Sequence, residues 1–138
     1  MTPKELIRQA KKAMEFAYAP YSGYKVGAAL LTKTGKVYLG CNIENAAYGP
    51  TNCAERTAIF KAVSEGEREF SCIAVVGGKD GVVEDVFPPC GICRQVMQEF
   101  CGHDFMIYMG RGDDSFEAVR LEELLPFGFS AKKYMAEN

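Results

Sequence analysis

Residues 26–66 read VGAALLTKTGKVYLGCNIENAAYGPTNCAERTAIFKAVSEG and contain two strand-like runs, a loop and a helix in succession. The runs Val26–Leu31 and Val37–Ile43 are apolar and rich in residues that favour β-structure. They lie on either side of Lys33-Thr34-Gly35, whose polar residues and glycine are typical of a tight turn. This stretch therefore predicts a β-hairpin that begins a sheet.

A loop and a helix follow the hairpin, and another helix precedes it. Asn45–Asn52 is polar and contains a Gly-Pro pair, which predicts a loop. From about Cys53 apolar residues recur at helical spacing until Gly66, which ends the pattern. At the other end of the chain, Thr2 is expected to cap a helix that stops before Pro20.

The rest of the chain alternates between strands and helices. Three further strands and two further helices are expected at Cys72–Val76, 90–102, Phe105–Met109, Ser115–Val119 and Leu121–Leu125. A hairpin followed by such alternation favours an α/β fold, a three-layer α/β/α sandwich around a mixed five-stranded sheet.

The composition is typical of a soluble globular protein. The 138 residues are 48% hydrophobic and 25% charged, which suits a single domain, residues 1–138, with a substantial core. The net charge of −2 and the lack of a long basic run argue against a nucleic-acid partner. No apolar run approaches the ~20 residues that span a membrane, and Met1–Glu5 has mixed charge without an apolar signal core. We therefore expect a cytoplasmic protein with no membrane partner.

Three cysteines in two short motifs predict a metal centre. Cys53 lies two residues before Glu55, and Cys90 and Cys93 form a C-x-x-C pair that follows a proline. Structural zinc sites are closed by four protein ligands, whereas catalytic sites keep three and leave the fourth position to water. Three thiolates and one carboxylate thus predict one catalytic Zn²⁺ per subunit, with Glu55 carrying protons to and from its water. The alternative for Glu55 is a solvent-facing residue that merely favours the helix dipole.

Both ligand motifs fall at predicted helix N-termini. Unpaired N–H groups and the positive end of the helix dipole lower the pKa of a thiol there and favour metal binding. Arg56 and Arg94 lie near ligand cysteines and are expected to donate hydrogen bonds to the sulfurs, which would offset the negative charge of three thiolates. The alternative for both is a solvated helix arginine.

Other uses of the cysteines are less well supported by the sequence. The remaining thiols lie in apolar stretches and are expected to be buried and inert: Cys41, Cys72 and Cys101. A structural zinc site would need one of these or His103 as its fourth ligand, yet none forms a second C-x-x-C or H-x₃-H unit. A thioredoxin-like pair at Cys90 and Cys93 would leave Cys53 and Glu55 without a role.

The sequence resembles the small, homotetrameric, zinc-dependent cytidine deaminases. The zinc motifs carry the resemblance most strongly, as Cys53-Ala54-Glu55-Arg56-Thr57-Ala58 and Pro89-Cys90-Gly91-Ile92-Cys93-Arg94-Gln95. Further segments follow the family pattern in order along nearly the whole chain: Ala19–Ser22, Val26–Leu30, Gly40–Tyr48 and Glu123–Pro126. The histidine that other deaminases use as first ligand is absent, which supports the branch that acts on free nucleosides.

The resemblance implies hydrolytic deamination of cytidine and 2′-deoxycytidine to the corresponding uridines, with release of ammonia, by a zinc-bound hydroxide and Glu55 as proton shuttle. It implies that Asn42 and Glu44 bind the ribose hydroxyls, and a buried polar pair at a strand end does require such partners. Ala54 would hold the pyrimidine edge. Tyr24, where the family commonly has Phe, and Tyr48 would line the base and sugar pocket.

The resemblance also implies a homotetramer in which a C-terminal aromatic residue covers the active site of a neighbouring subunit. Phe129 is the better-spaced candidate and Phe127 the alternative. The expected role is pyrimidine salvage or the catabolism of free nucleosides. Three other functions compete: deamination of a cytosine-nucleoside antibiotic of the blasticidin S type, a structural zinc module and, more distantly, nucleic-acid editing.

Overall fold

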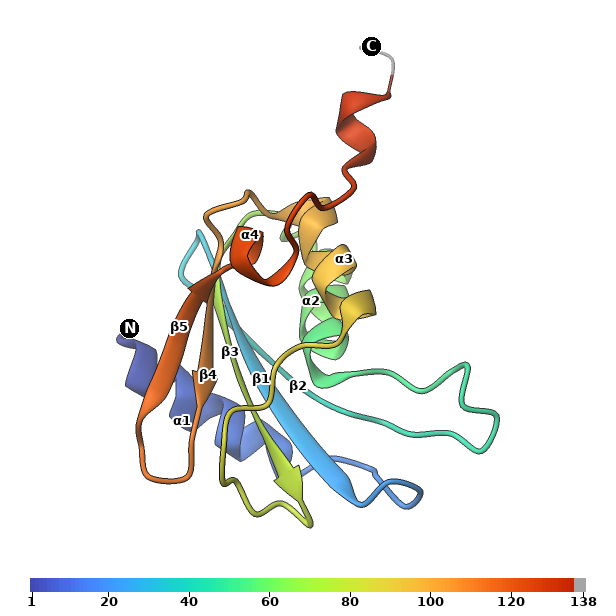
Figure 1. Ribbon diagram of the computed structural model, residues 1–138, viewed down its shortest axis with the longest axis vertical. Helices are drawn as coiled ribbons and strands as arrows, with labels where there is room; N and C mark the ends of the chain where they lie inside the picture. Colours follow the sequence, from blue (N-terminus) through green and yellow to red (C-terminus); the bar gives the residue numbers. More distant parts are fainter. Residues whose placement is uncertain (136–138) are drawn as a thin grey trace.

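The computed structural model describes residues 1–135, and its centre is a five-stranded mixed sheet (Figure 1). The strands are β1 (Tyr24–Thr32), β2 (Val37–Cys41), β3 (Phe70–Lys79), β4 (Met106–Gly110) and β5 (Phe116–Arg120). Their order is β2-β1-β3-β4-β5, and β3 and β4 form its parallel pair. The helices are α1 (Pro3–Met14), α2 (Ala54–Ser64), α3 (Gly91–Phe100) and α4 (Leu121–Leu124), followed by a 3₁₀ turn at Ala131–Lys133.

The two faces of the sheet are covered by different helices, because successive side chains of a strand point to opposite faces. One face packs against α2 and α3 in a core that includes Ala28, Leu30, Ile59, Ile73, Val75 and Met97. The other face packs against α1 in a second core that includes Leu6, Ile7, Ala10, Ala29, Ala74 and Val76. Figure 1 shows α2 and α3 side by side, with α1 on the far side of the strands. The predicted three-layer α/β/α fold around a mixed five-stranded sheet is confirmed.

The first helix begins as the sequence predicts and ends earlier. The Thr2 hydroxyl accepts from Glu5 N at 3.2 Å, and the Glu5 carboxylate accepts from Thr2 N at 2.8 Å, which is a complete capping box. The helix ends at Met14, and turns rather than helix lead to Pro20. Within residues 1–135, no helix has the length and apolarity needed to cross a membrane.

Two glycines allow helices to touch the backbone of the sheet. A Cβ atom at Gly27 would lie 2.0 Å from the carbonyl oxygen of Ala10 in α1. A Cβ atom at Gly40 would lie 2.3 Å from the carbonyl oxygen of Ala54 in α2. The first turn of α2 therefore lies directly against the end of β2, and that turn carries the first predicted metal ligand.

The end of β2 differs from the prediction. The strand stops at Cys41, and Ile43 instead pairs with Asn52 across the base of a loop, through two hydrogen bonds of 2.9 Å. This pairing closes the loop immediately before α2. Residues on the two sides of the loop base thus lie close together although ten positions of sequence separate Asn42 from Asn52.

Candidate metal centre and the cavity beside it

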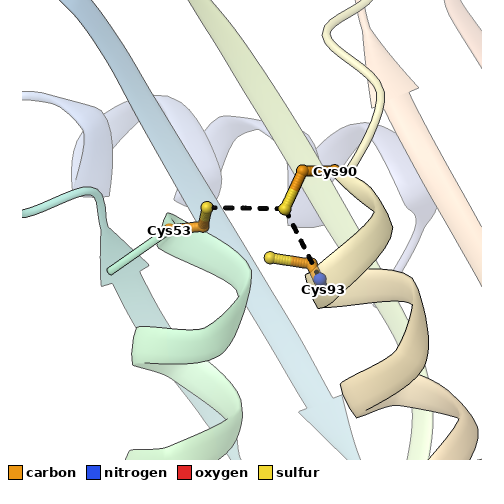
Figure 2. Close-up of side chains that lie close together, drawn as sticks. All are labelled: Cys53, Cys90 and Cys93. Carbon is orange, nitrogen blue, oxygen red and sulfur yellow. Dashed lines mark hydrogen bonds between the residues drawn. The ribbon is translucent and has the colours of Figure 1, made fainter. Parts of the chain in front are cut away.

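Three cysteine sulfurs converge between the N-termini of α2 and α3 (Figure 2). Cys53 is the N-cap residue of α2, Cys90 is the N-cap residue of α3, and Cys93 lies in the first turn of α3. The three Sγ atoms all lie within 4.8 Å of one another, and those of Cys53 and Cys90 are 3.7 Å apart. All three are free thiols.

The donor set fits a tetrahedral zinc ion. With Zn–S bonds of about 2.3 Å, tetrahedral geometry requires ligand sulfurs about 3.8 Å apart. The distance of 3.7 Å between Cys53 and Cys90 meets this requirement. Among residues 1–135 this is the one group of three or more such side chains close enough to hold a metal ion. A fourth protein ligand is therefore not found in the described chain, which suits an open rather than a closed site.

The surroundings of the sulfurs favour the thiolate form. The pKa of Cys53 is lowered to about 5, first because the Cys93 thiol donates toward its sulfur, and also because of Arg56. The same sharing of a proton raises the pKa of Cys93, so Cys53 ionises first. The Cys90 sulfur accepts from Cys93 N at 3.5 Å, which uses one of the unpaired N–H groups at the start of α3.

The two arginines near the ligands differ in what they contact. Arg56 Nη2 donates to Cys53 Sγ at 3.1 Å, as expected, and its buried Nε has no hydrogen-bond partner among residues 1–135. Arg94 instead donates to two carbonyl oxygens, Nε to Pro89 at 2.8 Å and Nη1 to Leu124 at 2.7 Å. In residues 1–135, the Arg94 guanidinium therefore donates to carbonyl oxygens and not to a cysteine sulfur, in contrast to the prediction. Its side chain points along α3 toward α4 and holds the backbone next to Cys90.

Glu55 is buried beside the sulfurs. It retains 3% of its exposure and lines a cavity of about 220 Å³ that Cys53 and Cys90 also line. Burial raises the pKa of its carboxyl to about 7. A solvent-facing residue would not show this shift, so the alternative reading of Glu55 does not fit its position. A carboxyl with a pKa near neutrality is suited to accept a proton and return it.

The cavity beside the sulfurs gathers most of the predicted site residues from separate parts of the chain. Its lining includes Tyr24 from β1, Asn42 and Glu44 from beyond β2, and Ala54 from α2. Other lining residues were not foreseen, namely Ser22, Val26, Thr51, Asn52, Phe87 and Pro88. The sequence offers one indication that Phe87 lies in the cavity, which is its position in an apolar run just before the second cysteine motif. Its ring lies 6.1 Å from that of Tyr24.

Asn42 and Glu44 are already engaged with the chain around them. The Asn42 amide accepts from Val26 N at 2.8 Å and donates to Tyr24 O at 2.8 Å, which fixes its plane against β1. The Glu44 carboxylate accepts from Tyr21 N at 2.9 Å and from both the N–H and the hydroxyl of Ser22. The hydroxyl of Ser22 and these backbone donors lower the pKa of Glu44. Each side chain is therefore held rigidly at the rim of the cavity.

Two of the residues predicted to bind the substrate lie outside the cavity that Cys53 and Cys90 line. Tyr48 lines an adjoining cavity of about 330 Å³ with Tyr21, whose ring lies 6.0 Å away, and its backbone is left-handed at φ 61°. Phe129 stacks on Tyr134 at a ring distance of 5.6 Å in the C-terminal segment, which Figure 1 shows projecting from the sheet and helices. Phe127 is fully exposed. Within one chain, neither phenylalanine lines either cavity.

Known proteins are similar to this chain in sequence and in fold. The chain matches the family model for the cytidine and deoxycytidylate deaminase zinc-binding region over residues 1–109. A cytidine deaminase from Sporosarcina psychrophila is 50% identical over 140 residues, which covers 100% of both chains. The solved structure of a cytidine deaminase from Burkholderia pseudomallei is similar with a TM-score of 0.86 at 48% identity, covering 94% of this chain and 100% of that one. A blasticidin-S deaminase from Bacillus cereus is 31% identical over 130 residues, 91% of each chain.

Proposed function

Because the chain belongs to the cytidine and deoxycytidylate deaminase family, we propose that it hydrolyses cytidine and 2′-deoxycytidine to the corresponding uridines and ammonia. One observation carries the proposal. Two sulfurs of the three-thiol cluster, those of Cys53 and Cys90, line the same cavity of about 220 Å³ as the buried carboxyl of Glu55. That combination supplies metal ligands and a proton carrier within reach of one small substrate.

Cys53, Cys90 and Cys93 would hold the zinc ion. Zinc bound there would supply Lewis acidity, which lowers the pKa of a water molecule and makes it nucleophilic at neutral pH. The two helix N-termini and Arg56 offset the negative charge of the three thiolates. This offset matters because a ligand set rich in negative charge weakens the acidity of such a water.

Glu55 would move the protons of the reaction. Its carboxylate accepts the proton that the attacking water loses and delivers it to a ring nitrogen of the base. It would then take the remaining proton from the hydroxyl added to the ring carbon and deliver it to the amino group as the carbon–nitrogen bond breaks, so that ammonia leaves and the oxygen of the water becomes the new carbonyl oxygen. Burial, which raises the pKa of Glu55 to about 7, allows both the protonated and the ionised form at neutral pH.

Asn42, Glu44, Ala54 and Tyr24 would bind the nucleoside. After its two bonds to β1, the Asn42 amide keeps one N–H and one lone pair for a sugar hydroxyl. The Glu44 carboxylate, fixed by Tyr21 and Ser22, would accept from a second hydroxyl. Ala54 leaves room for the pyrimidine edge, and the Tyr24 ring would pack against the base and sugar.

The assembly would be a homotetramer in the cytoplasm that takes part in pyrimidine salvage. Its support is the set of large apolar side chains on the surface of one chain, which includes Phe16, Phe60, Ile92, Phe127 and Phe129. Phe129, with Phe127 as the alternative, would reach the cavity of a neighbouring subunit, and Tyr48 would line the sugar side near a subunit boundary.

Turnover of cytidine with native and zinc-stripped protein tests the proposal. We expect zinc-dependent conversion to uridine, measured as the loss of the ultraviolet absorbance of cytidine. Adding zinc to the stripped protein should restore this turnover. A Glu55→Gln variant should keep its zinc and lose nearly all turnover. Near-normal turnover by a zinc-loaded Glu55→Gln variant would contradict the role of Glu55. Four sulfur ligands in a zinc X-ray absorption spectrum would support a structural zinc module instead.

Deamination of an antibiotic of the blasticidin S type is the second candidate. The relatives favour nucleosides, since identity is 50% to the cytidine deaminase and 31% to the blasticidin-S deaminase named above. Comparing kcat/KM for cytidine and blasticidin S separates the two, and a higher value for the antibiotic would reverse the assignment.

A further inference from the structure

The hydroxyl of Thr57 joins three segments of the chain beside the cavity. It accepts a hydrogen bond from Asn52 Nδ2 at 3.1 Å. Its single proton is donated toward two carbonyl oxygens, that of Cys41 at 3.0 Å and that of Cys53 at 3.1 Å. Thr57 is half-buried in the first turn of α2, so these contacts are partly shielded from water.

The three partners belong to different parts of the site. Cys41 is the last residue of β2 and precedes Asn42, the residue assigned to the sugar side. Asn52 closes the loop that contains Glu44 by pairing with Ile43. Cys53 is a metal ligand and precedes Glu55, which is assigned to the chemistry. One hydroxyl thus connects the sugar side of the cavity to its metal side.

Two kinds of contact place the end of β2 against the start of α2. At Gly40 the backbones of the two elements touch directly, and this close approach is not directional. The hydrogen bond from Thr57 to Cys41 O is directional, so it adds a constraint on their register. Removing the hydroxyl would also leave the Asn52 amide and the Cys41 carbonyl short of a partner.

We propose that Thr57 is a positioning residue, which holds the sugar-binding end of β2 in register with the metal-binding start of α2. The inference rests on the proposed function and adds a residue to it. Thr57 is not among the residues that line the cavity, and its hydroxyl bonds to none of the three cysteine sulfurs in residues 1–135. It acts through Cys41, Asn52 and Cys53, and its effect concerns the part of substrate binding that depends on the sugar hydroxyls.

Three variants isolate the hydroxyl. Thr57→Val removes it with little change of shape, and Thr57→Ser keeps it. Thr32→Val is the control, because Thr32 is a buried threonine whose hydroxyl also bonds to the chain, at Thr34 and Lys36 N, but at the far end of β1. Thr57→Ala serves as a second deletion of the hydroxyl if Thr57→Val fails to fold.

The kinetic readout compares cytidine with 2′,3′-dideoxycytidine, which lacks the 2′ and 3′ hydroxyls of the sugar and keeps the 5′ hydroxyl. Loss of one net hydrogen bond predicts that Thr57→Val raises KM for cytidine about three- to tenfold. For the dideoxynucleoside we expect a change of less than about twofold, since its binding does not use those hydroxyls. Thr57→Ser should resemble the native protein. Thr32→Val should lower the melting temperature without altering either KM.

Hydrogen exchange gives a readout that does not depend on activity. The amides of Ile43 and Asn52, which pair at the loop base, should exchange faster in Thr57→Val and remain protected in Thr32→Val. Unchanged exchange would overturn the proposal whatever the activity. So would an equal rise in KM for both nucleosides. Failure of the native protein to deaminate cytidine would refute the proposed function, while faster exchange at 43 and 52 alone would still support the link through Thr57.

Discussion

Three consecutive residues at the start of α2 point in different directions and have different tasks. Glu55 is buried and lines the cavity, Arg56 reaches back to the Cys53 sulfur, and Thr57 bonds to the end of β2. The helical rotation of about 100° per residue produces this separation. A C-x-E-R-T segment at a helix N-terminus therefore places the proposed proton carrier, a cation bonded to the Cys53 sulfur and the proposed positioning hydroxyl around one cysteine.

Replacing Arg56 with Gln should weaken zinc binding. The change removes the cation that donates to Cys53 Sγ at 3.1 Å, so the sulfur loses a hydrogen bond and the site keeps more negative charge. Loss of such a partner typically costs about 10–100-fold in metal affinity or activity. Competition with a chelator measures the affinity, with Arg68→Gln as the control because Arg68 is exposed beyond α2. Equal zinc affinity in both variants would show that Arg56 does not support the ligand.

Glu44→Gln should reduce stability in a way that depends on pH. The Glu44 carboxylate accepts from Tyr21 and Ser22, and these bonds lower its pKa from 4.5 in the folded chain. Because the pKa is lower in the folded chain, ionised Glu44 contributes stability at pH values above the pKa of the unfolded chain. That contribution is lost as the pH falls through the pKa of the folded chain. The difference in Tm between the zinc-free native and variant proteins should therefore be constant from about pH 8 to 5 and shrink below 4.5. A difference that grows on acidification would have the wrong sign.

Secondary-structure elements were predicted correctly where a local sequence pattern determines them. The hairpin, the capping box at Thr2 and the two cysteine motifs at helix N-termini were predicted because each is a local property of the chain. Arg94 was expected to contact a sulfur, and it bonds to the carbonyls of Pro89 and Leu124 instead. Its partner in α4 is set by tertiary packing, which spacing along the sequence does not encode. The place of Phe87 in the cavity lining was not predicted, because it also depends on tertiary packing.

Gly40→Ala should displace the metal-binding turn of α2. The new methyl group would lie 2.3 Å from Ala54 O and 2.6 Å from Ala58 N, so the helix has to move away from β2. Such overpacking typically costs about 1–3 kcal/mol of stability. We also expect weaker zinc retention, because Cys53 moves with the helix. Gly49→Ala is the control, since its methyl group would have Ala47 O as nearest neighbour at 3.9 Å. Unfolding by urea with a zinc assay compares the two, and equal stability would show that α2 does not depend on this contact.

The C-terminal segment of the molecule exposes aromatic side chains that contact with another subunit would cover. The end of the chain beyond α4 projects from the sheet and helices in Figure 1, and in this segment Phe127 is fully exposed with a left-handed backbone at φ 54°. The segment is nevertheless tied down, by Arg94 to Leu124 O and by Gln95 Nε2 to Phe129 O at 2.9 Å. Both donors lie in the turn of α3 that carries Cys93. A held, exposed aromatic segment is better suited to contact another subunit than to remain in water.

Mixing two defective variants tests whether Phe129 completes the site of a neighbouring subunit. Glu55→Gln removes the proton carrier and keeps Phe129, whereas Phe129→Ala keeps Glu55 and should raise KM. If Phe129 acts across a subunit boundary, exchange of subunits creates sites with Glu55 from one chain and Phe129 from the next. Low-KM turnover should then reappear in the mixture and in neither variant alone. If each chain uses its own Phe129, no site in the mixture has both groups, and KM stays at the value of Phe129→Ala. The same mixture made with Phe127→Ala identifies which of the two rings crosses the boundary, because only the ring that does so gives recovery on exchange.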